Sequence, residues 1–150
     1  MRHHEVLVRM LDGEGELIMP GAFIPAAERF NLMPEIDRWV VSRVFTLIAA
    51  HRDRLVDGGY HFAINLSGSS VTDRESLDFI VRMLAEYRVT GEMISFEITE
   101  TAAIANLSSA SNFIRTLKQF GCSFSLDDFG SGLSSFAYLK NLPVDFLKID

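Results

Sequence analysis

The sequence predicts an α/β fold made of parallel strand–helix–strand units, and two observations support it. Apolar runs of strand length alternate with amphipathic segments of helix length along most of the chain. Three expected strands end in polar residues, at Asn65, Glu97 and Asp127, with a repeat of about 30 residues that is typical of such units. If the units close into a barrel, these strand ends meet at one mouth. An open parallel sheet is the alternative, although no glycine-rich dinucleotide loop follows the first strand.

The expected strands are short runs bounded by turn residues, and they span Glu5–Met10, Tyr60–Leu66, Met93–Thr99, Phe124–Leu126 and Val144–Ile149. The expected helices carry apolar residues at helical spacing, and they span Phe23–Phe30, Pro34–Arg54, Glu75–Tyr87, Leu107–Phe120 and Ser134–Leu139. In the second of these helices, Trp39 and Leu47 are expected on the buried face. Leu11–Gly21 contains two glycine turn signals and is expected to be a loop.

Composition is that of an ordinary globular domain. The 150 residues suit a single domain with a real core, since 48% are hydrophobic and 23% are charged. The net charge of −6 argues against a protein that binds nucleic-acid polymers through a basic face. The single cysteine, Cys122, cannot form an internal disulfide and is expected in the core. No apolar run approaches the roughly 20 residues of a membrane span, and residues 1–4 do not open a signal peptide, so a cytoplasmic location is expected.

The chemistry of the chain is concentrated at Asp127 and Asp128, which follow the buried run Phe124–Leu126. Adjacent carboxylates repel each other, and burial raises that cost. A divalent cation such as Mg²⁺ removes the cost by binding the oxygens. In the simpler alternative, Asp128 caps the glycine-containing turn that follows and Asp127 is solvated.

Polar side chains from the other strands favour the metal hypothesis. In a barrel, six of them would converge on one mouth, namely Glu5, Asn65, Glu97, Asp127, Asp128 and Lys148. Four carboxylates and one carboxamide are oxygen ligands of the kind that hard cations take. The sequence therefore predicts an oxygen-ligand cage with a lysine beside it.

The motifs of the chain resemble, in order, those of the EAL-domain family. They are E-V-L-V-R at Glu5–Arg9, F-I-P-A-A-E at Phe23–Glu28, D-R-W-V at Asp37–Val40, N-L-S at Asn65–Ser67, E-I-T-E at Glu97–Glu100, D-D-F-G-S-G at Asp127–Gly132, and L-P-V-D with K-I-D at Leu142–Asp145 and Lys148–Asp150. Seven ordered motifs that cover essentially the whole chain are a specific signal. The chain departs from the usual pattern at Met10, Ser131 and Leu133, where tryptophan, threonine and tyrosine are common.

The resemblance implies a (β/α)₈, TIM-barrel-like fold and a metal-dependent phosphodiesterase of bacterial second-messenger signalling. Its substrate would be cyclic di-GMP, which is opened to linear pGpG. Since a full barrel of this type needs about 250 residues, residues 1–150 are expected to be a partial EAL domain. The family's first strand and its C-terminal part are expected to lie outside these residues.

The resemblance also implies a role for individual residues. The expected ligands of Mg²⁺ or Mn²⁺ are Glu5, Asn65, Glu97, Asp127 and Asp128, with Asp127 bridging to a second ion that Asp128 also binds. Lys148 resembles the lysine that holds the attacking water, and Arg9 the arginine that contacts a substrate phosphate. Glu100 resembles the glutamate that orders the loop after Asp128.

Two function classes are compatible with the motifs: the phosphodiesterase, and a catalytically inactive module that binds cyclic di-GMP or a protein partner. The parent domain is expected to be the enzyme, because every motif residue that can be compared is present. The 150-residue chain itself is expected to be inactive. It is also expected to self-associate, most simply as a two-fold dimer, because a partial barrel leaves Glu5–Met10 and Val144–Ile149 as open sheet edges.

Overall fold

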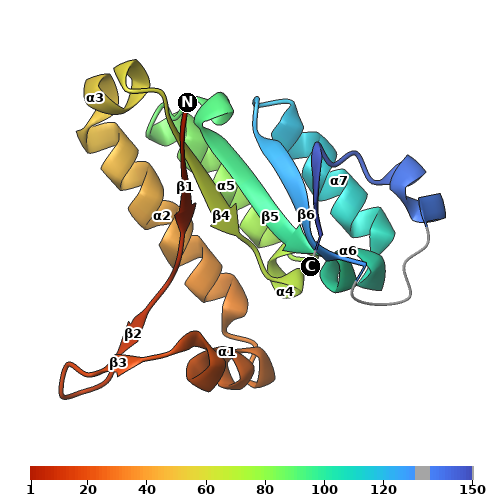
Figure 1. Ribbon diagram of the computed structural model, residues 1–150, viewed down its shortest axis with the longest axis horizontal. Coiled ribbons are helices and arrows are strands. Elements are labelled where there is room, and N and C mark those ends of the chain that lie inside the picture. The colour runs from red at the N-terminus through yellow and green to blue at the C-terminus, as the bar shows by residue number, and fades with distance from the viewer. Residues whose placement is uncertain (131–135, 150) are drawn as a thin grey trace.

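The computed structural model describes residues 1–130 and 136–149, which contain a five-stranded parallel sheet. Its strands are β1 (Arg2–Val6), β4 (Tyr60–Asn65), β5 (Ile94–Thr99), β6 (Ser123–Phe129) and β7 (Phe146–Ile149). They lie side by side in chain order, and every neighbouring pair is parallel. Figure 1 shows the long helices along one face of this sheet. The sheet confirms the expected α/β fold of parallel units.

Helical segments connect successive strands of the sheet. They are α1 (Pro20–Arg29), α2 (Met33–Ala50), α3 (Arg52–Asp57), α4 (Gly68–Val71), α5 (Arg74–Glu86), α6 (Glu100–Ala105), α7 (Leu107–Lys118) and the 3₁₀ helices η1 (Gly91–Met93) and η2 (Phe136–Asn141). An antiparallel hairpin, β2 (Met10–Leu11) and β3 (Leu17–Ile18), precedes α1. Polar side chains cap the helices that pack on the sheet: Asp73 accepts a hydrogen bond from the N–H of Glu75 in α5, and Asn106 one from the N–H of Ser109 in α7.

The core lies between the sheet and the helices. Ile94, Phe96 and Ile98 of β5 are almost completely buried. Successive side chains of a strand point to opposite faces, so these alternate residues share one face of β5. Phe96 packs against Phe124 of β6 with 5.5 Å between ring centroids, and Phe124 meets Phe113 of α7 edge-on. The face of β5 that these residues occupy is therefore the apolar, helix-covered face of the sheet.

The first strand lies earlier in the chain than the sequence predicts. The expected strand Glu5–Met10 is wrong, because β1 begins at Arg2 and ends at Val6. Parallel pairing with β4 aligns Arg2 with Tyr60 and Val6 with Ile64. The side chains of β1 are mostly exposed, so its pairing rests on backbone hydrogen bonds and leaves no apolar pattern in the sequence.

Other boundaries and faces also differ. Trp39 and Leu47 are 57% and 48% exposed, so their predicted place on the buried face of α2 is wrong. The buried stripe of that helix is narrower than its apolar stripe. Leu11–Gly21 is not a simple loop, since it includes β3 and the start of α1. Of the expected helix Ser134–Leu139, the first two residues lie outside the described residues, and the rest belongs to the 3₁₀ helix η2. The last strand begins two residues after Val144.

Short helices that the sequence did not predict follow two of the strands. α4 comes after β4 and is capped by Ser67, and α6 comes after β5 and is capped by Thr99. Asp37 of α2 supports the first of them: its Oδ2 accepts hydrogen bonds from the N–H of Ser67 (2.9 Å), the hydroxyl of Ser67 (2.7 Å) and the hydroxyl of Ser70 (2.6 Å). This buried carboxylate fixes the backbone directly after Asn65.

The predicted core position of Cys122 is confirmed. Burial, followed by the charge of Glu92, raises the pKa of the Cys122 thiol to about 12, so it carries no thiolate at neutral pH. In residues 1–130 and 136–149, no helix is both long and apolar enough to cross a membrane.

Candidate active site at the carboxyl ends of the strands

Five strands bring polar side chains toward the carboxyl end of the sheet. The side chains are those of Glu5 (β1), Asn65 (β4), Glu97 (β5), Asp127 (β6) and Lys148 (β7). The pairing of β4 with β5 aligns Asn65 with Glu97, and the pairing of β5 with β6 aligns Thr99 with Asp127. The parallel register thus gathers residues that are far apart in the sequence.

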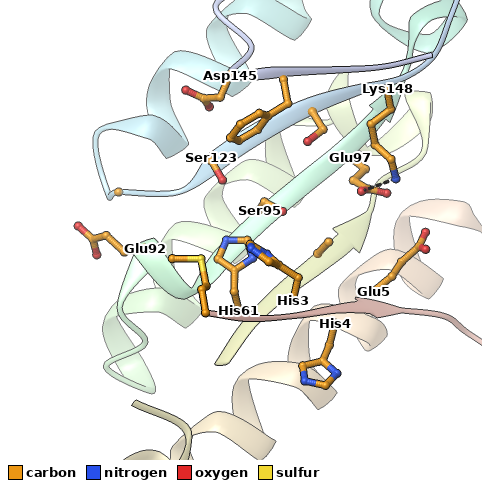
Figure 2. Close-up of a pocket in the computed structure, with 15 residues that line it drawn as sticks. His3, His4, Glu5, His61, Glu92, Ser95, Glu97, Ser123, Asp145 and Lys148 are labelled. Carbon is orange, nitrogen blue, oxygen red and sulfur yellow. Dashed lines mark hydrogen bonds and ion pairs between the residues drawn. The ribbon is translucent and has the colours of Figure 1, made fainter. Parts of the chain in front are cut away.

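Two contacts join these side chains directly. The amide Nδ2 of Asn65 donates a hydrogen bond to Oε1 of Glu5 at 3.4 Å. The ammonium of Lys148 donates to Oε1 of Glu97 at 2.9 Å and forms an ion pair with it. Figure 2 shows this pair reaching from β7 to β5, past the intervening strand β6.

Glu97 is the most buried of the expected metal ligands. Its side chain is only 6% exposed, and although Oε1 is paired with Lys148, the buried Oε2 has no hydrogen-bond partner among the described residues. A buried carboxylate oxygen without a partner carries a desolvation cost that a bound cation would remove. Together with the oxygen donors of Glu5 and Asn65, this orphaned oxygen fits a hard divalent cation.

The charges of the site act on Lys148 together. Its pKa is raised, first by the hydrogen bond to Glu97, then by the negative charges of Glu97, Asp127 and Glu5, while burial acts in the opposite direction. Lys148 therefore stays protonated and faces the field of three carboxylates. In this arrangement its ammonium is the positive charge that balances Glu97.

The carboxylates are not drawn together into one coordination shell. In the part of the chain that the structure describes, no group of three or more His, Cys, Asp or Glu side chains is placed to hold a metal ion. Oδ1 of Asp127 accepts a hydrogen bond from the N–H of Asp128 at 2.9 Å. Asp128 is exposed and has a φ of +53°, a left-handed conformation that is uncommon outside glycine. The backbone bends sharply just where the two aspartates meet.

Glu100 lies behind this bend and is almost fully buried at 2% exposure. Its Oε1 accepts a hydrogen bond from the N–H of Gly130 at 3.3 Å, and its Oε2 accepts one from the hydroxyl of Tyr138. Burial and this hydrogen bond raise the pKa of Tyr138 to about 12. Tyr138 was missed by the sequence reasoning, because no local pattern links two residues that are 38 positions apart. Ser131, Gly132 and Leu133 of the expected loop lie outside the described residues.

Two cavities open onto these residues. One, of about 250 Å³, is lined by Arg9 together with Asn65, Ser67, Glu97 and Thr99. Arg9 thus reaches the same cavity as two expected ligands, while its Nη1 donates to the carbonyl of Val8 at 2.8 Å. The other cavity, of about 710 Å³, lies on the face of the sheet opposite the helices and includes Glu5, Glu97 and Lys148 (Figure 2).

Comparison with known proteins identifies the family. The model of the EAL domain matches residues 1–150, the full length of the chain. This chain belongs to the EAL domain family. It is 41% identical to the cyclic di-GMP phosphodiesterase PdeB of Shewanella oneidensis over 146 residues, which cover 97% of this chain and 17% of PdeB. It is 38% identical to the cyclic di-GMP phosphodiesterase PdeF of Escherichia coli over 148 residues, which cover 99% of this chain and 20% of PdeF. The chain thus spans at most a fifth of the length of these two relatives.

Solved EAL domains share the fold. The FimX EAL domain of Pseudomonas aeruginosa, bound to c-di-GMP, superposes with a TM-score of 0.88 at 32% identity, covering 99% of this chain and 58% of that one. The PaMucR phosphodiesterase in complex with c-di-GMP gives a TM-score of 0.86 at 31% identity and covers 100% of this chain and 62% of that one. The five-stranded sheet of this EAL domain is therefore one side of a TIM-barrel-like fold.

Proposed function

We propose that this EAL domain takes part in the metal-dependent hydrolysis of cyclic di-GMP to linear pGpG. The observation that carries the proposal is Glu97, a buried carboxylate with one unpartnered oxygen at the carboxyl end of the sheet. Support also comes from relatives that are named cyclic di-GMP phosphodiesterases and from similar EAL domains solved with c-di-GMP. In barrels of this type the chemistry takes place at this end of the strands.

The donor set suits Mg²⁺ or Mn²⁺. Glu5, Asn65, Glu97 and Asp127 would hold one ion, and Asp127 with Asp128 a second. Bound ions of this kind supply positive charge to the phosphate oxygens and lower the pKa of a coordinated water. Such an ion would also supply the positive charge that Lys148 now provides to Glu97.

The other residues of the site position the reactants. Lys148, once released from Glu97, donates a hydrogen bond to the attacking water. Arg9 lines the cavity that contains Asn65 and Glu97, where its guanidinium matches a phosphate diester. Glu100 accepts hydrogen bonds from residues on both sides of the loop, Gly130 and Tyr138, which fixes the backbone after Asp128.

The reaction consumes one water for each bond that is broken. The water oxygen forms a bond to phosphorus as the bond from phosphorus to the 3′-oxygen breaks. The leaving 3′-oxygen takes up a proton, and the second proton of the water is released to a base. The product is a linear dinucleotide with one 5′-phosphate and one free 3′-hydroxyl.

A second candidate function is binding of cyclic di-GMP without turnover. It is favoured by the ion pair between Lys148 and Glu97, which occupies the carboxylate with a side chain, and by the absence of a three-residue metal cluster in residues 1–130 and 136–149. Little or no hydrolysis is also expected from the 150-residue chain by itself. This alternative would be correct if the longest natural chain that carries this domain bound cyclic di-GMP but formed no pGpG.

The test is an assay of that longest natural chain in the presence of Mg²⁺ or Mn²⁺, in which chromatography measures the pGpG that is formed. Glu97→Gln and Glu5→Gln are expected to lower kcat at least 100-fold, because each removes a charged ligand. Lys148→Ala is expected to slow turnover while Mn²⁺ binding, measured by calorimetry, stays nearly intact. Glu86→Gln at the exposed end of α5 is the matched control. An unchanged rate for Glu5→Gln at saturating metal would refute the ligand assignment.

A further inference from the structure

A tyrosine that the sequence did not single out contacts the carboxylate behind the candidate active site. The hydroxyl of Tyr138 in η2 donates a hydrogen bond to Oε2 of Glu100, the first residue of α6, which is 2% exposed. The other oxygen of that carboxylate, Oε1, accepts a hydrogen bond from the N–H of Gly130 at 3.3 Å. One buried carboxylate therefore links η2 to the backbone that follows β6.

The backbone at the end of β6 has a conformation that needs support from its surroundings. Asp128 has a φ of +53° and Gly130 a φ of +92°. The left-handed region is unfavourable for a residue with a side chain and persists only where neighbouring structure holds it. Asp128 is exposed, so packing around its side chain contributes little to that hold. The hydrogen bond from Gly130 to Glu100, two residues further along the chain, supplies part of it.

The 3₁₀ helix η2 is anchored independently of this hydrogen bond. Tyr138 and Leu139 pack against the hydrophobic core, and Leu142, just after η2, is 2% exposed. The ring of Phe136 lies 5.4 Å from that of Phe129, the last residue of β6, with an angle of 55° between the ring planes. An element that is fixed by apolar contacts can hold the polar group that it carries in a defined place.

We infer that Tyr138 is a positioning residue of the candidate active site: its hydroxyl holds Glu100, and Glu100 holds the backbone that presents Asp128. The inference rests on the proposed function, in which Asp128 binds the second metal ion. A shift of the backbone at Asp128 would turn its carboxylate away from that ion. Burial, followed by the hydrogen bond to Glu100 and its charge, raises the pKa of Tyr138 to about 12, so the hydroxyl keeps its proton at neutral pH.

The chain offers a substitution and a matched control. Tyr138→Phe keeps the ring and its core contacts and removes only the hydroxyl. Tyr87 also packs against the core through a partly buried side chain, and among the described residues its hydroxyl makes no hydrogen bond. Tyr87→Phe therefore removes a hydroxyl of the same kind without the link to Glu100. Circular dichroism and Tm verify that both variants fold like the original chain.

The first measurement follows the backbone itself. Hydrogen-exchange mass spectrometry of the longest natural chain, without metal or nucleotide, reports on peptides that cover residues 127–130. Tyr138→Phe is expected to speed their exchange about fivefold or more, because Glu100 loses one of its two fixed points. Tyr87→Phe should not change it. Glu100→Ala should speed the same exchange, and adding Tyr138→Phe to Glu100→Ala should have no further effect, because both act through one contact.

The second measurement separates positioning from a merely structural role. In calorimetric titration with MnCl₂ alone, Tyr138→Phe is expected to raise the Kd of the weaker ion about tenfold and to leave that of the tighter ion unchanged. In the pGpG assay, kcat should fall about tenfold with an unchanged KM, because Arg9 is untouched. A higher concentration of Mn²⁺ should restore part of the rate. Tyr87→Phe should match the original chain in both assays.

Three results would overturn the inference. They are unchanged exchange of residues 127–130 in Tyr138→Phe, faster exchange with unchanged Mn²⁺ binding and kcat, and a further loss when Tyr138→Phe is added to Glu100→Ala. An original chain that binds no Mn²⁺ and forms no pGpG would instead refute the proposed function. Because the exchange experiment contains neither metal nor nucleotide, it would then decide by itself whether Tyr138 holds the backbone at Asp128.

Discussion

The two faces of the sheet carry different kinds of side chain. On the helix-covered face of β5, Ile94, Phe96 and Ile98 are buried among apolar side chains. On the opposite face, Ser95 and Glu97 are also buried but polar, and they line the large cavity. Barrel interiors are usually filled by bulky branched side chains. In β5 the apolar contacts therefore lie on the helix side, whereas the opposite face carries small and ionisable residues.

The largest expected effect on the free energy of unfolding comes from a substitution on the helix-covered face. Phe96→Ala removes a fully buried ring and is expected to lower the free energy of unfolding by about 3–5 kcal/mol. Ser95→Ala, the neighbouring residue on the other face, is expected to cost less than about 1 kcal/mol. Urea denaturation followed by circular dichroism measures both. Equal losses for the two variants would show that the open face contributes as much to stability as the core does.

The next effect concerns the support that the helices give to the site. Asp37→Ala leaves the N–H of Ser67 and the hydroxyls of Ser67 and Ser70 without their acceptor. A loss of about 2–3 kcal/mol is expected in the same denaturation assay. Asp37→Asn keeps one acceptor oxygen of nearly the same shape and should lose less. If the two variants lost the same amount, the three hydrogen bonds would not be what stabilises the backbone after Asn65.

A third prediction compares the edges of the sheet with its centre. β1 and β7 are the outer strands of the five, and Ile149 is 82% exposed. We expect the chain to self-associate through these edges, most simply as a two-fold dimer, which light scattering at micromolar concentration would detect. Leu147→Lys in β7 should raise the dissociation constant about tenfold, or about 1.4 kcal/mol. Phe30→Lys, at an exposed position just after α1, should not change it. A monomer mass for the original chain would contradict the expectation.

The smallest effect is the pH dependence that comes from Lys148. Its folded pKa is raised above the unfolded value, so its contribution to stability is complete below that value and is lost as the pH rises through the folded pKa. Because the side chain is 43% exposed, solvent screening keeps this contribution small. Thermal unfolding as the pH rises above the ordinary lysine value of 10.5 should show a slightly steeper decline in Tm for the original chain than for Lys148→Met. Parallel declines would mean that the ion pair with Glu97 adds nothing to stability.

The sequence predicted the centre of the fold well and its first edge poorly. β4, β5 and β6 each overlap an expected run, because buried strands leave apolar residues in the sequence. β1 was misplaced, since an exposed edge strand is held by backbone hydrogen bonds to β4 that carry no side-chain signal. Trp39 was placed inside because helical spacing predicts an apolar stripe but not how much of that stripe the sheet covers.

The site was predicted as a set of residues but not as a set of contacts. Parallel strand ends predicted that Asn65 and Glu97 would be neighbours, and the register agrees. No pattern in the sequence could predict that Lys148 pairs with Glu97 or that Tyr138 binds Glu100, because these contacts depend on side-chain reach between distant elements. The metal ligation of the expected residues stays a prediction.

The passage from β5 into α6 has a consequence for how this chain can vary. Four consecutive residues each have a different neighbour: Glu97 pairs with Lys148, Ile98 fills the core, Thr99 caps α6, and Glu100 binds Gly130. Insertion or deletion of one residue within β5 would turn the strand side chains that follow it to the opposite face and would displace the start of α6. Such a change would remove an ion pair, a core contact, a helix cap and a loop anchor in a single event. We therefore expect length variation among natural homologues to be excluded from this stretch and to accumulate at the β2–β3 hairpin.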